Sequence, residues 1–259
     1  MRILMVGDVC GRPGRQMLRE QVPQLKRAHK IDLTIVNGEN AAAGFGVTRP
    51  IYEEILAAGA DVVTLGNHTF DKREAVSLLD EEPRLLRPLN YPPGTPGQGY
   101  CIVQAGGQRV LVANAMGRVF LPMDLDCPFR GVDALLEEQS GRYDLFFLDF
   151  HAEATSEKEA MGWYLDGRAA GVVGTHTHIQ TADDRVLPGG TAYLTDVGMT
   201  GPSESVLGMD RKAVIGRFLS QMPARFEVAE GKRQISAVVV ATDPESGLAT
   251  EVQRILIRE

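Results

Sequence analysis

The fold class follows from residues 1–40, MRILMVGDVCGRPGRQMLREQVPQLKRAHKIDLTIVNGEN. Two short apolar runs, Ile3–Val6 and Leu33–Val36, flank an amphipathic segment over residues 14–29. The runs show no alternation of apolar and polar residues, which is typical of strands that are covered on both faces. A strand, a helix and a strand in this order predict parallel neighbouring strands joined by a right-handed crossover.

The same alternation continues along the chain, with one interruption. Two β-like runs, 100–104 and 109–113, are joined through Gly106-Gly107 and predict a hairpin in a mixed sheet. The other predicted strands are 62–65, 145–150, 170–174, 191–194, 224–228, 235–241 and 252–257, and the other predicted helices are 49–58, 71–79, 132–139 and 156–165. No repeat or linker is evident. We therefore predict one α/β domain over residues 1–259, with two mixed β-sheets and helices outside them.

The composition is that of an ordinary soluble globular protein, with 44% hydrophobic and 24% charged residues. The net charge of −7 argues against broad binding of a nucleic-acid backbone, although it does not exclude a local basic groove. The three cysteines form no CxxC pair, which favours a reducing compartment. The sequence contains neither a signal-peptide core nor the roughly 20-residue apolar stretch of a spanning helix. These features predict a cytoplasmic protein without a membrane partner.

Polar side chains gather where five of the apolar runs end. The five clusters are Gly7-Asp8, Asn37-Gly38-Glu39-Asn40, Gly66-Asn67-His68, His151 and Gly174-Thr175-His176-Thr177-His178. In open α/β sheets, ligands bind beyond the carboxyl ends of the strands. If these runs are parallel neighbours, all five clusters meet at one edge, and two carboxylates, two amides and four histidines share a cleft.

Each cluster taken alone is weak evidence for a site. Asp8 or Asn67 is also the kind of residue that a strand-to-helix turn favours, and His151 would fit a hydrogen-bonded core position. The distribution of histidines is more specific, because four of the five in the chain lie at these strand ends. His176 and His178 are separated by one residue in an extended segment, so both rings leave the same face.

The mixture of donor types indicates metal chemistry. Carboxylates, imidazoles and amide oxygens suit borderline metals such as manganese, iron or zinc. Seven candidate ligands exceed what one tetrahedral ion uses, which favours two ions that share a carboxylate. Such a pair activates a bridging hydroxide at neutral pH for in-line displacement at phosphorus, so no serine or cysteine nucleophile is needed.

Two motifs resemble the metallophosphoesterase superfamily: Gly66-Asn67-His68 and the closing Gly174-Thr175-His176-Thr177-His178. The sequence is most similar to the YmdB-type branch, and this resemblance covers nearly the whole chain. The segments that carry it are Gly7-Asp8, Gly11–Gly14, Asn37–Ala42, Asp149–Lys158 and Leu187–Tyr193. The resemblance implies a four-layer α/β/β/α fold and phosphodiesterase activity on cyclic nucleotides such as 2′,3′-cyclic monophosphates.

The resemblance also implies a role for each candidate residue. In the wider superfamily the first motif is Asp-x-His, whereas Asp8 is followed here by Val9 and Cys10, and Glu39-Asn40 stands where a bridging aspartate is usual. One ion is then held by Asp8, Glu39, Asn40 and His178, and the other by Glu39, Asn67, His151 and His176. His68 stays off the metals, as general acid towards the leaving oxygen or as a group that stabilises charge there, which suits the near-neutral titration of imidazole. The alternatives for His68 are an eighth ligand or a hydrogen-bonding strut.

Three other functions compete with a metal-dependent phosphodiesterase. A dinucleotide-dependent oxidoreductase is disfavoured because Gly7, Gly11 and Gly14 do not spell GxGxxG. A regulatory or RNA-associated metal-binding protein with weak turnover stays open, because ligands that are intact for catalysis are also intact for binding. A phosphomonoesterase stays open as well. The expected partner is a small phosphodiester or nucleotide, and the sequence leaves nucleic-acid binding and homo-oligomer formation open.

Overall fold

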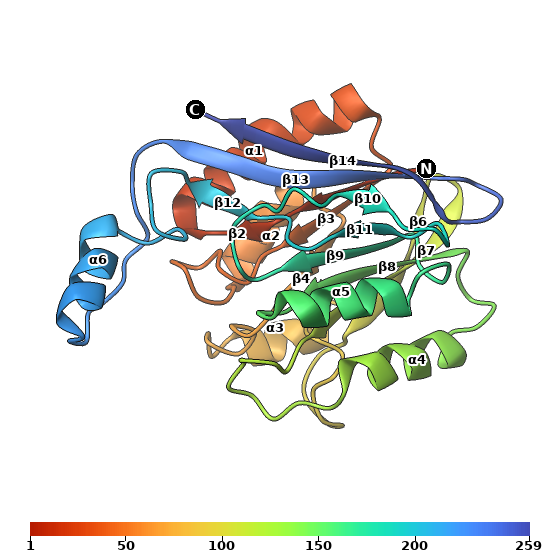
Figure 1. Cartoon of the computed structure of the whole chain (residues 1–259), viewed down its shortest axis with the longest axis horizontal. Coiled ribbons are helices and arrows are strands. Elements are labelled where there is room, and N and C mark those ends of the chain that lie inside the picture. Colours follow the sequence, from red (N-terminus) through yellow and green to blue (C-terminus); the bar gives the residue numbers. More distant parts are fainter.

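The N-terminal strand lies inside an eight-stranded mixed sheet in the computed structural model, which describes residues 1–259 (Figure 1). In spatial order its strands are β2 (Asp8–Val9), β12 (Met199–Pro202), β13 (Arg233–Thr242), β1 (Arg2–Val6), β3 (Leu33–Asn37), β4 (Val62–Thr64) and β5 (Leu85–Leu86), and β14 (Ala249–Arg258) pairs with β13. Strands β1, β3, β4 and β5 run parallel, as the order of the elements predicts. Strand β13 is antiparallel to β1, so the sheet is mixed.

A second sheet of six strands packs against the first. In spatial order it contains β10 (Arg185–Val186), β11 (Ala192–Leu194), β9 (Gly171–Thr175), β8 (Leu145–His151), β7 (Gln108–Met116) and β6 (Tyr100–Ala105). The predicted hairpin is present as the antiparallel pair β6–β7, and β7, β8 and β9 run parallel.

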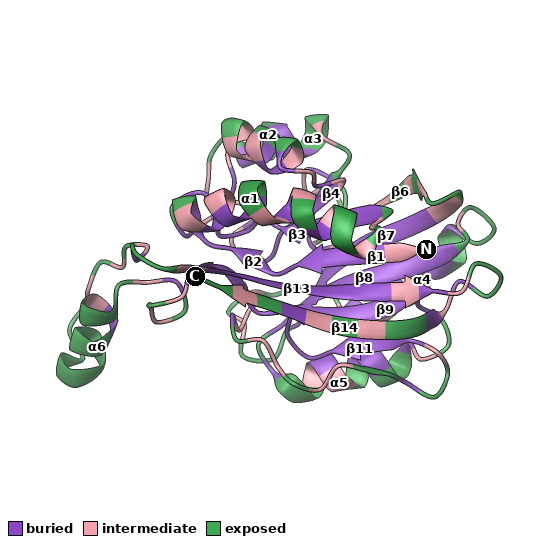
Figure 2. Ribbon diagram, turned by 90° about the horizontal axis from the view of Figure 1, so that it is seen from above, coloured by how far each residue is buried: buried purple, intermediate pink, exposed green.

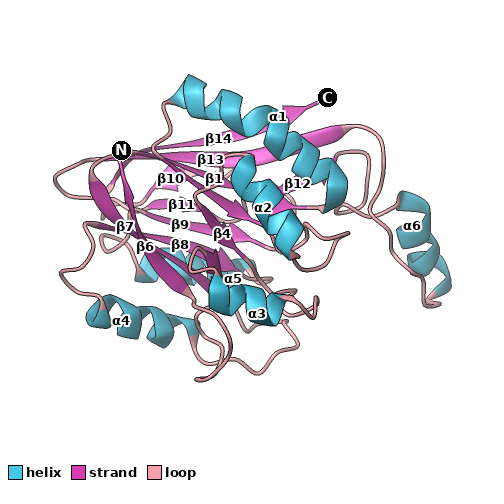
Figure 3. Ribbon diagram, turned by 180° about the vertical axis from the view of Figure 1, so that it is seen from behind, coloured by secondary structure: helices cyan, strands magenta, loops and turns pink.

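Helices cover the outer faces of both sheets (Figures 1 and 3). Side chains of α1 (Gly11–His29), α2 (Arg49–Ala57) and α3 (Ala75–Glu81) share a core with the first sheet, and side chains of α4 (Pro128–Glu138) and α5 (Thr155–Tyr164) share one with the second. The short α6 (Arg211–Ser220) projects from this body. The layers confirm the predicted sandwich of two mixed sheets with helices outside.

Strand β1 shows how the layers are held together. Its alternate side chains Leu4 and Val6 pack against the helices, while Ile3 and Met5 pack between the two sheets. Both faces are therefore buried, which explains the continuous apolar run (Figure 2). Each such side chain contributes roughly 1.5–3 kcal/mol when it is fully buried.

Two expectations about the strands are wrong. The five polar clusters follow strands of two sheets rather than neighbours in one sheet: β1, β3 and β4 belong to the first, and β8 and β9 to the second. The clusters still converge, because the two sheets place these strand ends beside each other. The predicted strand 224–228 is a loop in which only Val228 forms an isolated bridge, with Met209.

No helix of the chain combines the length and the apolar composition that crossing a lipid bilayer requires.

Candidate metal centre and catalytic site

All eight predicted site residues lie at or just beyond the ends of five strands. Asp8 lies two residues after the end of β1, His151 is the last residue of β8, and the remaining six follow β3, β4 and β9 within a few residues. Seven of the eight side chains form two adjoining groups of donor atoms, and the exception is His68.

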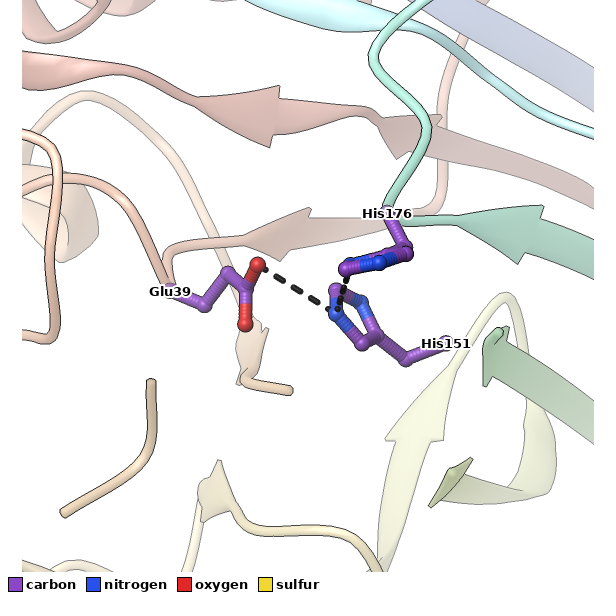
Figure 4. Close-up of side chains that lie close together, drawn as sticks. All are labelled: Glu39, His151 and His176. Carbon is purple, nitrogen blue, oxygen red and sulfur yellow. Dashed lines mark hydrogen bonds and ion pairs between the residues drawn. The ribbon is translucent and has the colours of Figure 1, made fainter. Parts of the chain in front are cut away.

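One group of donor atoms surrounds Nε2 of His151. This nitrogen lies 2.9 Å from Oδ1 of Asn67, 3.0 Å from Nδ1 of His176 and 3.3 Å from Oε1 of Glu39. Figure 4 shows Glu39 and the two imidazoles pointing toward one another from three different segments. Nε2 of His151 can carry at most one proton, which cannot serve all three of these acceptors. A cation would instead accept electron pairs from all four atoms, Nε2 included.

A second group contains Asp8, Glu39 and His178. Ligand atoms of these three side chains lie within 4.8 Å of one another, and all three residues are buried. Nε2 of His178 also lies 3.2 Å from Oδ1 of Asn40. Oδ1 of Asp8 is buried and has no hydrogen-bond partner, which is costly for a carboxylate unless another group, such as a cation, compensates it.

Gly66 keeps the space between the donor atoms open. A Cβ atom at this position would lie 2.3 Å from both Oε2 of Glu39 and Nε2 of His151. Any side chain here would therefore displace these two donors. The unpartnered Asp8 oxygen, the shared Glu39 and the open space at Gly66 together fit two cations that share one carboxylate.

Each histidine of the two groups has one ring nitrogen bonded away from the donor atoms. Nδ1 of His151 donates to Oγ1 of Thr175 (2.9 Å), and Nδ1 of His178 donates to the carbonyl oxygen of Leu207 (3.0 Å). Nε2 of His176 lies 3.0 Å from the Glu153 carboxylate. These contacts fix the ring orientations and leave the other nitrogen of each ring facing the group.

Asp149 holds residues of both sheets together next to the donor groups. Its carboxylate accepts hydrogen bonds from Thr175 (2.8 Å), Thr64 (2.5 Å) and Asn37 (3.1 Å), which come from both sheets. Burial raises the pKa of Asp149, and these hydrogen bonds partly offset that effect. Thr175 thus connects Asp149 to the His151 ring, which explains a carboxylate inside an apolar strand.

Burial and neighbouring charges shift the pKa values of the side chains in the two groups. Burial would raise the pKa of Glu39, but His151 and the other nearby histidines lower it well below its ordinary value. Burial likewise lowers the pKa of His176, and the neighbouring His151 lowers it further. Glu39 is therefore ionised and His176 neutral at neutral pH, the forms in which both bind metal.

His68 lies beside the donor groups but belongs to neither. Its Nδ1 donates to the Asp71 carboxylate (2.7 Å), and its ring packs edge-on against Phe45 with centroids 5.0 Å apart. Its side chain is 25% exposed. The ring borders a cleft of about 270 Å³ that Glu39, His176 and His178 also line. A bound substrate can reach His68 from this cleft.

Sequence reasoning missed two of these residues. Asp71 follows His68 by three positions, a spacing that lets a carboxylate reach the ring within one turn. Thr175 lies inside the Gly174–His178 motif and was not assigned a role. Threonine and aspartate are common in turns, so neither residue type stood out without the fold.

Comparisons with known proteins identify the family of the chain. The model of the family described as YmdB-like proteins matches residues 4–255. The 2′,3′-cyclic-nucleotide 2′-phosphodiesterase of Bacillus subtilis is 55% identical, with 100% of this chain and 98% of that protein covered.

Two solved structures have the same fold over the whole chain. A hypothetical protein from Thermus thermophilus is 44% identical with a TM-score of 0.94, and 100% of both chains is covered. A phosphatase from Mycoplasma pneumoniae is 34% identical with a TM-score of 0.94, covering 100% of this chain and 93% of that one. These matches confirm the resemblance indicated by the motifs, and the chain belongs to the YmdB-like family.

Proposed function

We propose that this protein is a metal-dependent phosphodiesterase that hydrolyses 2′,3′-cyclic nucleotides. The observation that carries the proposal is the pair of donor groups that share Glu39, with His68 beside them and outside both. The name of the Bacillus subtilis relative supports both the reaction and the substrate class.

In this proposal Glu39 would be shared by two ions. The first would be held by Asp8, Glu39, Asn40 and His178, and the second by Glu39, Asn67, His151 and His176. Manganese and iron suit this mixture of carboxylate, amide and imidazole donors best, and zinc is an alternative. When bound, the ions supply an activated water molecule and stabilise negative charge on the phosphoryl oxygens.

His68 would protonate the leaving oxygen. Because Nδ1 donates to Asp71, Nε2 is the nitrogen that is free to face the cleft. A proton held on Nε2 can pass to the oxygen that leaves phosphorus, and the contact with Asp71 orients the ring for this transfer. The contact with Phe45 adds edge-on packing to the hydrogen bond that orients the ring.

Hydrolysis of model esters tests the proposal against a binding-only or phosphomonoesterase function. With added Mn²⁺ the protein should release p-nitrophenol from bis-p-nitrophenyl phosphate, and a chelator should abolish the release because the ions supply the nucleophile. p-Nitrophenyl phosphate should react more slowly. Protein that retains two ions but hydrolyses neither ester would favour the regulatory function, and faster cleavage of the monoester would favour a phosphomonoesterase.

A panel of cyclic nucleotides tests the substrate class. We expect 2′,3′-cyclic monophosphates to react faster than 3′,5′-cyclic monophosphates. If the bond cleaved is that of the Bacillus subtilis relative, whose name specifies a 2′-phosphodiesterase, the product is the 3′-phosphate. Chromatography of the products distinguishes 2′- from 3′-phosphates.

We also propose that residues 1–259 act as one domain in the cytoplasm. The family match over residues 4–255 and the contacts of Asp149 with both sheets support the single domain. The three free cysteines are consistent with a reducing compartment.

We further propose that copies of the chain associate through α6. Phe218 and Leu219 on this helix are 74% and 83% exposed, an unusual exposure for large apolar side chains. The segment 210–227 has four basic and two acidic side chains, a small net charge that leaves the exposed apolar residues as its main contact surface. Light scattering should give a mass above that of one chain, and the variant F218E/L219E should be monomeric. A monomeric wild-type protein would contradict this.

A further inference from the structure

The two histidines of the closing motif lie in an unfavourable backbone conformation rather than in the extended segment that the sequence predicts. The φ angles of His176 and His178 are +102° and +66°, in the region that favours glycine. Residues other than glycine remain there only when surrounding contacts hold them. These two residues contribute to different donor groups, so the turn between them determines the geometry of both.

The contacts that hold this turn converge on Asp196. Thr177, between the two histidines, donates to Oδ2 of Asp196 through both its backbone N–H (3.0 Å) and its hydroxyl (2.7 Å). Oδ1 of the same carboxylate accepts from the backbone N–H of Gly198 (2.8 Å). Asp196 is fully buried, so these bonds are shielded from competition with water.

Lys158 completes the arrangement from α5. Its ammonium donates to Oδ2 of Asp196 (2.7 Å), and its side chain is only 2% exposed. Lysine is almost never this buried without a charged partner. Its stem passes Gly174, where a Cβ atom would lie 3.0 Å from Cδ of Lys158 and 1.8 Å from the carbonyl oxygen of Thr195. The glycine of the closing motif thus makes room for both the lysine and the neighbouring strand.

We propose that Lys158 and Asp196 are positioning residues that act through Thr177 to aim His176 and His178 at the two metal positions. The inference rests on the proposed function, because it assumes that both donor groups bind metal. It assigns a role to Lys158, which lies in the segment Asp149–Lys158 but contacts neither donor group. The buried Lys158–Asp196 ion pair would thereby orient one ligand at each of the two metal positions.

Titration of Mn²⁺ into the metal-free full-length chain, followed by calorimetry, tests this proposal. Lys158→Met should weaken binding at both positions by about 10–100-fold, the usual effect of removing a group that orients metal ligands. Lys26→Met is the control, since Lys26 also bonds an aspartate but is 30% exposed and lies on α1. It should leave Mn²⁺ affinity unchanged.

Thr177→Val serves as a second variant in case Lys158→Met does not fold. It removes one hydroxyl donor and retains the ion pair, so we expect Mn²⁺ binding about tenfold weaker, at the low end of the same range. A melting temperature measured for each metal-free variant separates stability from affinity. A purely structural role would lower the melting temperature of folded variants while leaving Mn²⁺ affinity unchanged.

Two results of the Mn²⁺ titration separate failure of the inference from failure of the proposed function. If wild-type protein binds two Mn²⁺ and the folded variants bind them with wild-type affinity, the inference is overturned and the proposed function stands. If wild-type protein does not bind two Mn²⁺, the proposed function fails and the inference fails with it.

Discussion

Replacing Glu39 with glutamine should remove both metal ions and reduce hydrolysis to the level of chelated wild-type protein. Glu39 is the only residue that belongs to both donor groups, and its carboxylate is 1% exposed. A neutral amide cannot supply the charge that a bridging position between two cations requires. Metal content per chain, measured by plasma mass spectrometry on protein purified with Mn²⁺, gives the direct readout.

Glu53→Gln is the matched control for this variant, because Glu53 is an exposed residue of α2. It should retain two ions per chain and wild-type turnover. If Glu39→Gln retained one ion at full occupancy, the shared-carboxylate arrangement would be wrong. The two donor groups would then have to be independent sites.

Replacing His68 with alanine should leave two ions in place and slow hydrolysis of cyclic nucleotides by roughly 10²–10⁴-fold, the typical effect of losing a general acid. The reason is geometric: the His68 ring bonds Asp71 and packs against Phe45, and only the backbone N–H, which the variant keeps, contacts Oε2 of Glu39 (3.3 Å). The leaving oxygen of a nucleotide is basic and needs a proton. Steady-state rates and metal content should be measured on the same preparations.

The choice of leaving group separates proton transfer from other roles of His68. p-Nitrophenolate leaves without protonation, so bis-p-nitrophenyl phosphate should be slowed much less by the substitution. Equal slowing of both substrates would show that His68 does not act as an acid, and loss of an ion would show that it is a ligand. His29→Ala, on α1 away from the site, should change neither quantity.

The core of the fold was predictable because its strands are buried on both faces. Runs such as Ile3–Val6 and Leu33–Val36 are apolar throughout, and the structure places them side by side and parallel. The sequence could not assign each strand to a sheet, since a parallel strand in either sheet has the same pattern. That is why the five clusters were expected at one edge rather than at the junction of two sheets.

Helix α6 and the segment 224–228 were not predictable for a related reason. The apolar residues Val214, Ile215, Phe218 and Leu219 lie on one face of the helix, but this pattern covers fewer than two turns and three of the four side chains are exposed. A short helix outside the main layers has no core that would impose a pattern on its sequence. The apolar residues of 224–228 suggested a strand, but no neighbouring strand pairs with them apart from the bridge at Val228.

The convergence of the site residues was predictable, but their supporting contacts were not. The eight site residues lie together because they follow strand ends, and the direction of a parallel strand fixes where its last residues lie. The positive φ angles of His176 and His178, and the contacts of Thr177 with Asp196, depend on segments distant in sequence. No local pattern encodes them.

The central claim is that two cations share Glu39, and anomalous diffraction from crystals grown with Mn²⁺ tests it most directly. We predict two anomalous peaks per chain, one on each side of the Glu39 carboxylate, with Asp8 and His178 at one and His151 and His176 at the other. A single peak, or peaks remote from Glu39, would contradict the account.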